Sequence, residues 1–309
     1  MQDKFEIAYD GYLNSFSTSL SPELKSIYKK YALGNRDRGE EIANSIVTIL
    51  GSSIHGLSCI DIGSGYGGLL LGLAKKGASV LGIEYDKQLY ELSLTNIQDE
   101  PYDIHIRYGD ILDREVIPAG TKFDLITIND VFEHIFDIEF LFKKLDQISH
   151  ENTIIYFEIP NHHSYHAIRK EHHKHIYGLT LIEPGSWAEI VGSFNIYHRS
   201  FYLYKLLFKS IGYKNIRFNQ LNKESIGTFD RIIREHSLIF SELQNHDFKT
   251  SRLKSAALSN FKKLHDFFVD ESDHKSEEEL FIEYEAYVWS GIIKKKSLDT
   301  QSNNITIEL

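Results

Sequence analysis

Asp61-Ile62-Gly63-Ser64-Gly65-Tyr66-Gly67-Gly68, residues 61–68, is the stretch that decides the fold of this 309-residue chain. It follows a short apolar run at residues 57–62 and precedes a helical pattern over residues 69–76. Glycines at such a position permit a tight turn and let the backbone approach a ligand closely. The order of strand, glycine-rich turn and helix therefore predicts a ligand-binding loop at the end of a buried strand.

The same alternation continues along the chain. Residues 79–84, 103–108, 123–128 and 153–159 predict further strands, while residues 87–97 and 138–148 predict helices. Strands that alternate with helices predict an α/β fold, with βαβ units and a mostly parallel sheet. Ligands of such sheets bind at the carboxyl ends of the strands, so the site is expected there.

Four regions of the chain have different patterns. Residues 1–52 predict an N-terminal helical segment, and residues 53–220 with 284–295 predict the α/β core. Residues 160–200 and 221–283 predict insertions that form a helical cap, and residues 296–309 predict a frayed tail. An apolar stripe suits packing within the chain or a homodimer contact; it consists of Ile232, Ile233, Leu238, Ile239 and Leu243.

Composition restricts the class of protein. The formal net charge is −10, which argues against broad nucleic-acid binding, because phosphate binding needs clustered Lys and Arg. No segment approaches the roughly 20 apolar residues that span a bilayer. Cys59 is the single cysteine, so neither an internal disulfide nor a cysteine zinc cluster is expected. We expect a soluble, cytoplasmic protein.

Acidic residues around the loop indicate the kind of ligand. Asp61 precedes the glycines, and Asp110 and Asp130 follow the third and fourth predicted strands. Glu84 ends the second strand, where a carboxylate accepts hydrogen bonds from ribose hydroxyls. Glycines 63, 65 and 68 also have the spacing of an NAD-binding loop. A pyrophosphate would be repelled by these carboxylates, whereas the ammonium and sulfonium of S-adenosylmethionine would be attracted.

In these motifs the chain resembles class I S-adenosylmethionine-dependent methyltransferases, and in particular the ubiquinone-pathway O-methyltransferases. The resemblance rests on four segments in order, namely 61–67, 81–86, 109–111 and 123–135. It implies a Rossmann-like, seven-stranded, mostly parallel sheet with helices on both faces. Residues 213–218 would be its sixth strand and residues 284–293 its antiparallel seventh.

The resemblance also implies a set of cofactor-binding residues. Gly63 and Gly65 would face the methionine moiety, and Asn129 the cofactor edge, while Arg36 or Arg38 would pair with the cofactor carboxylate. The expected set is Asp61, Gly63, Ser64, Gly65, Gly67, Glu84, Tyr85, Gly109, Asp110, Ile111, Asn129 and Arg38.

Asp130, Glu133 and His134 predict a metal site if their turn is helical, because they would lie on one face. Carboxylate and imidazole ligands at this spacing suit Mg²⁺ or a similar cation. The stretch is similar to the Glu-x-x-Glu-His metal motif of ubiquinone-pathway and small-RNA 3′-end methyltransferases. Here the first acid is Asp, and relatives with Asp at this position include proteins without metal.

Six histidines lie between residues 161 and 175, after the fifth predicted strand. A histidine there would act as general base toward a hydroxyl nucleophile, or complete a metal site with Glu133 and His134. His175, His162 and His134 are the candidate catalytic residues.

The sequence thus predicts an S-adenosylmethionine-dependent O-methyltransferase for a small-molecule or glycan acceptor, with polysaccharide biosynthesis as the favoured setting. Alternatives are an RNA 2′-O-methyltransferase, a noncatalytic module that keeps the cofactor fold, and an NAD-dependent oxidoreductase.

Overall fold

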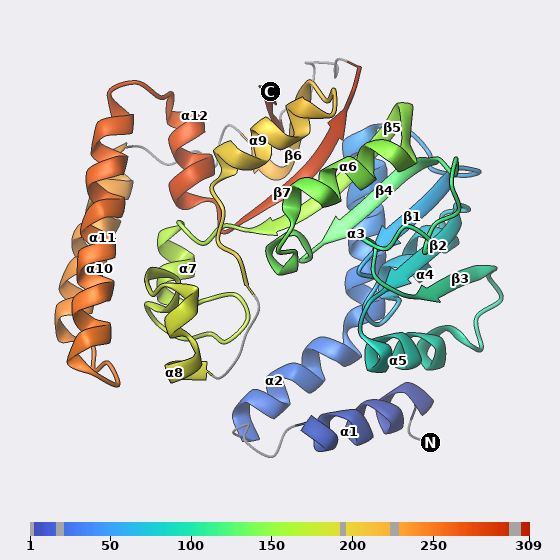
Figure 1. Cartoon of the computed structure of the whole chain (residues 1–309), viewed down its shortest axis with the longest axis horizontal. Helices are drawn as coiled ribbons and strands as arrows, with labels where there is room; N and C mark the ends of the chain where they lie inside the picture. Colours follow the sequence, from blue (N-terminus) through green and yellow to red (C-terminus); the bar gives the residue numbers. More distant parts are fainter. Residues whose placement is uncertain (1–2, 17–21, 192–195, 223–228, 297–303) are drawn as a thin grey trace. The chain divides into compact units, whose positions relative to one another are not determined.

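The computed structural model describes residues 3–16, 22–191, 196–222, 229–296 and 304–309. Its α-helices are α1 (Lys4–Phe16), α2 (Pro22–Leu33), α3 (Asn35–Leu50), α4 (Gly68–Lys75), α5 (Lys87–Ile97), α6 (Ile138–Ile148), α7 (Tyr165–Arg169), α8 (Ala188–Val191), α9 (Phe201–Ser210), α10 (Phe229–Asn245), α11 (Ser251–Ser272) and α12 (Glu277–Leu280). Its strands are β1 (Ser58–Ile62), β2 (Ser79–Glu84), β3 (Ile104–Tyr108), β4 (Phe123–Asn129), β5 (Ser149–Pro160), β6 (Asn215–Asn222), β7 (Val288–Lys294) and β8 (Asn304–Glu308) (Figure 1).

The predicted α/β class is confirmed. The strands follow the order β3-β2-β1-β4-β5-β7-β6-β8 in one sheet. Strand β1 pairs in parallel with β2 and with β4, and β2 pairs in parallel with β3. Parallel neighbours need crossover connections, which α4 and α5 provide. The predicted number of seven strands is wrong, because β8 adds an eighth strand that pairs antiparallel with β6.

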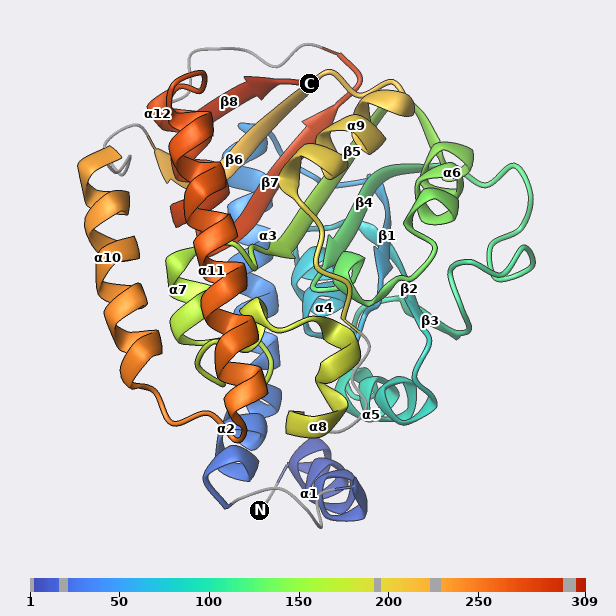
Figure 2. The same cartoon turned by 60° about the vertical axis from the view of Figure 1, so that its left-hand side comes forward.

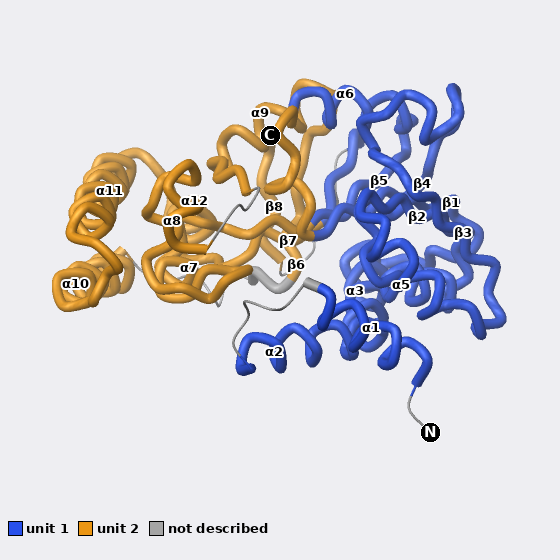
Figure 3. Tube along the Cα trace, turned by 60° about the horizontal axis from the view of Figure 1, so that its bottom comes forward, with its two compact units in different colours: residues 1–129, 139–157, 292–296 blue, residues 130–138, 158–291, 297–309 orange. Residues whose placement is uncertain are grey.

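The chain divides into two compact units, which are described separately (Figure 3). Unit 1 consists of residues 1–129, 139–157 and 292–296. Unit 2 consists of residues 130–138, 158–291 and 297–309. This division follows contacts in space, so it cuts across the predicted boundaries at residues 53, 160, 221 and 284.

In unit 1, helix α3 packs very closely on α4. A β-carbon at Gly39 would lie 2.2 Å from the backbone of Gly68, and one at Gly68 would lie 2.2 Å from the carbonyl oxygen of Asn35. Gly68 therefore permits helix packing, which accounts for the third glycine of the NAD-like spacing. Because α4 follows the glycine loop directly, this contact fixes where the loop ends.

In unit 2, the two predicted insertions share one hydrophobic core. Residues from 165–196 pack against Ile239 and Leu243 of α10 and Leu253, Ala257 and Phe261 of α11. Helices α10 and α11 lie side by side (Figures 1 and 2). In the predicted stripe, Ile232, Ile239 and Leu243 are buried and Ile233 is partly buried, whereas Leu238 is 49% exposed. The stripe thus packs largely within the chain.

Several predicted boundaries differ from the structure. The frayed tail is a correction, because residues 304–308 form β8, whereas residues 297–303 lie outside the described part. Residues 281–285 form a π-helical turn, so β7 begins at Val288 rather than Tyr284. The predicted helical insertion at 221–283 contains the helices α10, α11 and α12, and its residues 223–228 lie outside the described part. Among the described helices, none has both the length and the apolar character to cross a bilayer.

Candidate functional site

The glycine loop of unit 1 has left-handed backbone at three positions. Gly63, Gly65 and Gly67 have φ values of 72°, 52° and 79°, which favour residues without a β-carbon. The backbone N–H groups of Gly63 and Ser64 donate to the carbonyl oxygen of Ile83 at 2.8 and 3.1 Å. The loop is therefore tied to the end of β2.

Two carboxylates are buried beside this loop. Glu84, at the end of β2, is 6% exposed and accepts hydrogen bonds from the N–H groups of Gly65 at 2.7 Å and Asp86 at 2.8 Å. Asp61, in β1, is 3% exposed and accepts a 2.6 Å hydrogen bond from the Thr127 hydroxyl. The parallel register of β1 with β2 and β4 brings these groups to the same end of the sheet.

Burial raises the pKa of Asp61 to about 7, although the Thr127 hydroxyl opposes this effect and the Glu84 charge adds to it. Burial also raises the pKa of Glu84, against the hydrogen bonds from Asp86 and Gly65. Both acids hold their negative charge at a cost, which a cationic or hydroxyl-bearing ligand would reduce.

Two further polar atoms, one in the glycine loop and one at the end of β4, lack protein partners. The hydroxyl of Ser64 and the side-chain oxygen of Asn129 are buried and make no hydrogen bond. A buried polar group without a partner costs stability, so these atoms fit a site completed by a ligand. The ammonium and ribose hydroxyls of S-adenosylmethionine are donors of the kind that these oxygens and carboxylates accept.

The other predicted cofactor residues follow β2 and β3. Tyr85 is 72% exposed next to Glu84, and Ile111 is buried. The N–H of Gly109 donates to the Glu84 carbonyl oxygen, and Asp110 accepts from the N–H of Leu112 at 2.8 Å. The last residue of β2 is thus joined to the first residue after β3.

Arg36 and Arg38 both contact protein groups. Arg36 donates to Asn96 and to Glu100, and Arg38 stacks 3.6 Å above the Tyr31 ring while donating to the Tyr31 carbonyl oxygen. Arg36 therefore holds α3 to α5. A role for Arg38 at the cofactor carboxylate stays a prediction.

Unit 2 contains a second cluster, which is built around Glu133. Residues 132–134 form one 3₁₀ turn, and Glu133 is 1% exposed, with no hydrogen bond to either carboxylate oxygen. The Nε2 atoms of His134 and His173 lie 3.8 and 3.5 Å from its Oε1. These three side chains offer ligand atoms within 4.8 Å of one another, a geometry that fits a metal ion.

The third predicted metal ligand, Asp130, is not in this group. It has a left-handed backbone with φ of 52°, and its N–H donates to the Glu158 carbonyl oxygen. The turn after Asp130 is a single 3₁₀ turn and not an α-helix. The α-helical spacing that would put Asp130, Glu133 and His134 on one face is therefore absent. His173 supplies the third donor. The sequence analysis had predicted that a histidine of this segment could complete the site, but it did not identify which one.

Glu171 supports this cluster, and sequence reasoning missed it. It is fully buried and accepts from the N–H groups of His173 and Lys174 and from Nδ1 of His173 at 3.0 Å. Burial raises its pKa, but His173 and these hydrogen bonds outweigh burial and lower it to about 2. Burial lowers the pKa of His173, but Glu133 and Glu171 outweigh it and raise it to about 9.

Next to this cluster, His162 is buried and His172 and His198 are partly buried, and burial favours the neutral form of all three. His162 stacks on His198 with ring centroids 3.8 Å apart, and His172 stacks on Tyr287 at 3.9 Å. Burial lowers the pKa of His162 strongly, that of His172 to about 4 and that of His198 to about 3. Both ring nitrogens of His162 and the Nε2 atoms of His172 and His198 lack hydrogen-bond partners.

Of the predicted catalytic histidines, His134 and His162 thus lie in this histidine-rich part of unit 2. His175 does not belong to the metal-type group; it has a left-handed backbone with φ of 56°, and its N–H donates to the Glu171 carbonyl oxygen. Sequence reasoning also missed Arg199, which donates to the carbonyl oxygens of Phe132, Ile135 and Phe136 and so holds the Glu133 turn.

Comparison with known proteins agrees with this geometry. A family model described as "Methyltransferase domain" matches residues 34–216, which is more than half of the chain. A ubiquinone biosynthesis O-methyltransferase from Pelagibacter ubique is 28% identical over 105 residues, 34% of this chain and 42% of that protein. Its counterpart from Rhizobium etli is 30% identical over 87 residues, 28% of this chain and 34% of that protein. The chain thus spans less than half the length of the curated relatives it matches.

A solved structure of magnesium protoporphyrin IX methyltransferase from Synechocystis PCC 6803, with bound S-adenosylhomocysteine, is 15% identical with a TM-score of 0.46. The similarity covers 68% of this chain and 85% of that chain. From the family match over residues 34–216, the chain belongs to the methyltransferase-domain family of class I S-adenosylmethionine-dependent enzymes.

Proposed function

We propose that the protein transfers the methyl group of S-adenosylmethionine to a hydroxyl group of an uncharged acceptor. The observation that carries this proposal is the Glu133 carboxylate, which is buried, accepts no hydrogen bond and faces two imidazoles. A hydroxyl is a poor nucleophile until its proton is accepted or its charge is stabilised, and such a carboxylate is placed for that task.

Unit 1 would bind the cofactor through Asp61, Glu84, Ser64 and Asn129. Methyl transfer moves the methyl group from sulfur to the acceptor oxygen, and the hydroxyl proton leaves to a base. The sulfonium already activates the methyl group, so alignment supplies much of the rate.

Glu133, His134 and His173 would hold a divalent cation. When bound, such a cation would stabilise the acceptor as its alkoxide. Two of the three donors are imidazoles, so the set suits Zn²⁺ or Mn²⁺ as well as Mg²⁺. His173 would give up its proton on binding the ion, because a metal ligand must be a neutral imidazole. Without an ion, Glu133 itself would accept the proton.

The charges of unit 2 favour an uncharged acceptor. His162, His172 and His198 are neutral imidazoles, which both donate and accept hydrogen bonds and so suit hydroxyl groups. Arg199, a nearby permanent cation, already donates to three backbone carbonyls. A phosphate or carboxylate would meet Glu133 and Glu171 instead. This favours a small polyol, phenol or sugar over a nucleotide sugar or RNA.

The relatives' names, which specify O-methylation in ubiquinone biosynthesis, support oxygen as the acceptor atom. A glycan acceptor, a role in polysaccharide biosynthesis, a cytoplasmic location and a homodimer are parts of the proposal that rest on sequence reasoning. His134, His162 and His175 likewise stay predictions as catalytic residues.

The test measures release of S-adenosylhomocysteine from S-adenosylmethionine with a panel of acceptors: a catechol, a methyl glycoside, a sugar phosphate and a short RNA. We expect turnover with an uncharged hydroxyl compound. Replacement of Glu133 by Gln should reduce kcat by about 100-fold or more, the usual scale for a positioned acid–base group. Glu139→Gln, on the exposed surface of α6, is the matched control and should keep full activity.

Activity that disappears in EDTA and returns with Mg²⁺, Mn²⁺ or Zn²⁺ would support the metal; full activity in chelator would leave Glu133 as the base. Turnover with RNA alone would favour the RNA 2′-O-methyltransferase. Tight binding of S-adenosylmethionine without turnover on any hydroxyl compound would refute O-methylation and favour the noncatalytic module.

A further inference from the structure

The turn that carries Glu133 has little support of its own. Residues 132–134 form one 3₁₀ turn, and the hydrogen bond that closes it, from the N–H of Ile135 to the carbonyl oxygen of Phe132, is 3.4 Å long. Hydrogen bonds in 3₁₀ turns have poor geometry, and a single turn has no neighbouring turn to reinforce it. Yet this turn keeps Glu133 1% exposed, although water would solvate its charge better. Another part of unit 2 must therefore hold the turn in place.

The three-residue segment 197–199 supplies that support. The N–H of Tyr197 donates to the carbonyl oxygen of Glu133 at 2.7 Å. The guanidinium of Arg199 donates at 2.6 to 3.1 Å to three further carbonyl oxygens, those of Phe132, Ile135 and Phe136. The segment thus binds the backbone of the turn from its first residue to the residues that follow it.

Helix α9 anchors Arg199. Ser200, the next residue, caps this helix, because its hydroxyl accepts a backbone N–H of the first turn at 3.3 Å. Further along α9, Tyr204 and Phe208 pack edge to face on the Phe132 ring, with ring centroids 5.7 and 6.0 Å away. The same helix therefore fixes Arg199, through the adjoining cap, and the first residue of the Glu133 turn.

His198 connects the segment to the histidines of the proposed acceptor site. Its ring stacks on that of His162 at 3.8 Å and meets that of Trp187 edge to face at 5.1 Å. Adjacent residues of one short segment therefore contact the Glu133 turn and the neutral histidines. Such a segment would keep an acceptor hydroxyl and the Glu133 carboxylate at a fixed separation, which methyl transfer requires.

We propose that Arg199 is a positioning residue for methyl transfer, which keeps the Glu133 carboxylate buried and facing His134 and His173. It acts through the backbone carbonyls of the turn and not through contact with the reacting atoms. The planar guanidinium suits this task, because its N–H donors form a rigid fork that reaches several carbonyls at once, whereas a lysine ammonium is a point charge on a flexible stem. The inference rests on the proposed role of Glu133 in accepting the hydroxyl proton or holding a cation.

The experiment measures S-adenosylhomocysteine release by Arg199→Lys in two backgrounds, the wild-type chain and Glu133→Gln, with the catechol and the methyl glycoside as acceptors. Lysine keeps the charge and loses the fork. In the wild-type background kcat should fall by about tenfold or more, because misplacement of a reacting group by about 1 Å costs on the order of 100-fold. In the Glu133→Gln background the same change should alter kcat by less than about twofold, because residues that act through one group are not additive.

Two measurements do not depend on turnover. Calorimetry should give Arg199→Lys the wild-type affinity for S-adenosylhomocysteine. Hydrogen exchange should be faster than in the wild type for the amides of residues 131–138, and unchanged for those of residues 58–84. Arg199→Gln, whose amide can donate to fewer carbonyls, is the second variant if the lysine variant does not fold.

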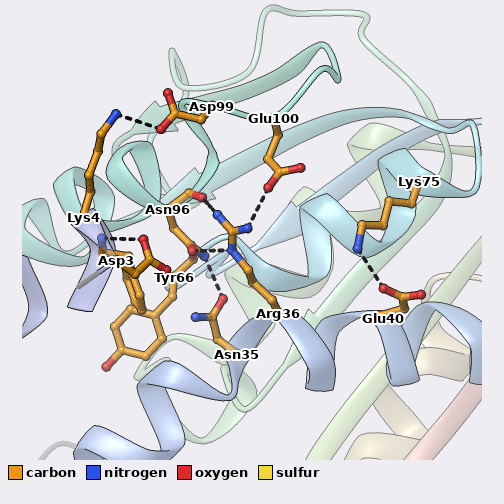
Figure 4. A network of polar contacts seen from close by, with 11 residues as sticks. Asp3, Lys4, Asn35, Arg36, Glu40, Tyr66, Lys75, Asn96, Asp99 and Glu100 are labelled. Atoms are coloured by element: carbon orange, nitrogen blue, oxygen red, sulfur yellow. Dashed lines mark hydrogen bonds and ion pairs between the residues drawn. The ribbon is translucent and has the colours of Figure 1, made fainter. Parts of the chain in front are cut away.

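Two other arginines are the controls. Arg234 is exposed on α10, so Arg234→Lys should keep the wild-type kcat. Arg36 holds α3 to α5 through the side-chain oxygen of Asn96 and through Glu100 (Figure 4). Arg36→Lys should therefore lower Tm and change kcat by the same factor in both backgrounds, as expected of a structural arginine.

An equal loss of kcat from Arg199→Lys in both backgrounds, or no loss in the first, would overturn the inference alone. Failure of both Arg199 variants to fold would also overturn it, because Arg199 would then hold the whole unit and not the turn. Full activity of Glu133→Gln, or no turnover of either acceptor by the wild-type chain, would overturn the proposed function as well.

Discussion

Replacement of Asp61 by Asn is predicted to stabilise the fold while it weakens cofactor binding. Asn keeps the size of the side chain and an oxygen that can accept the Thr127 hydroxyl at the position of the present 2.6 Å hydrogen bond. It removes only the ability to carry a negative charge in a site where the side chain is 3% exposed. The substitution therefore measures how much one buried charge reduces the stability of the fold and how much it contributes to cofactor binding.

The magnitude follows from the pKa of Asp61, which burial raises from an ordinary value of 3.8 to about 7. Between these values the folded state holds a proton that the unfolded chain releases, so the stability of the wild type falls as pH rises from about 4 to about 7. Above pH 7 the full cost is present, ~4 kcal/mol from the two values. Asn does not ionise, so Asp61→Asn should be more stable by about this amount at pH 8 and equal to the wild type near pH 4.

The measurement is thermal and urea unfolding of both proteins between pH 4 and pH 8, with calorimetric titration of S-adenosylhomocysteine at each pH. A gain of ~4 kcal/mol corresponds to roughly 10 °C in Tm. The wild-type affinity should weaken as pH falls below 7, because the ammonium group of S-adenosylhomocysteine prefers the ionised acid. The affinity of Asp61→Asn should be at least about tenfold weaker at pH 8 and should change little with pH.

Asp124 provides a control of opposite sign. It accepts hydrogen bonds from the N–H and hydroxyl of Ser58, which lower its pKa. Asp124→Asn should therefore reduce stability at pH 8, with a loss that fades as pH falls through the lowered pKa, and leave cofactor affinity unchanged. If Asp61→Asn lowers Tm at pH 8, or binds S-adenosylhomocysteine as the wild type does, then the buried charge of Asp61 is not a binding device.

Two further predictions concern the backbone. Gly39→Ala should reduce the free energy of unfolding by about 3 kcal/mol, because its β-carbon would lie 2.2 Å from the Gly68 backbone. Gly11→Ala, whose β-carbon would have nothing within 4 Å, should stabilise helix α1 slightly. Equal urea midpoints for the two variants would contradict the close packing of α3 on α4. His175→Gly should raise the free energy of unfolding by about 1 kcal/mol, because a φ of 56° strains a residue that has a β-carbon. A lower Tm for this variant would mean that the contacts of the imidazole outweigh the backbone strain.

The α/β core could be predicted from sequence because its signals are local. Strand β2 and helix α5 begin and end at the predicted residues, 79–84 and 87–97. Asp86 marks the start of α5, since its side chain accepts from the N–H groups of Gln88 and Leu89. Periodicity and capping act within a few residues, so one sequence is enough to read them.

Elements that depend on distant partners could not be read in this way. Strand β8 has the alternating sequence Asn-Ile-Thr-Ile-Glu, but its five residues become a strand only by pairing with β6, about ninety residues away. The turn before β7 is fixed by Asn161, whose amide donates to the carbonyl oxygens of Ile282, Glu283 and Ala286. The local sequence at these residues therefore does not reveal the distant partner that orders them.

The same distinction separates the residues of the candidate site. Asp61 and Glu84 were predictable, because acids at the ends of predicted parallel strands must lie at one edge of the sheet. The choice of His173 among six neighbouring histidines was not, because it depends on Glu171 holding its Nδ1 and so directing Nε2 toward Glu133. Glu171 is an acidic residue within the histidine-rich segment, and this is the one local feature of the sequence that indicates a fixed orientation for a neighbouring imidazole.

The direction of the pKa shifts distinguishes carboxylates that hold the fold from those that await a ligand. Asp124 and Glu242 have lowered pKa values because Ser58 and Arg169 already stabilise their charges. Asp61 and Glu84, by contrast, have raised pKa values, because burial outweighs every protein partner they have. A fold gains nothing from such acids by itself, since a neutral side chain in their place would be more stable. Their cost is recovered only when a donor or cation arrives, and the adenosyl cofactor of this family brings both.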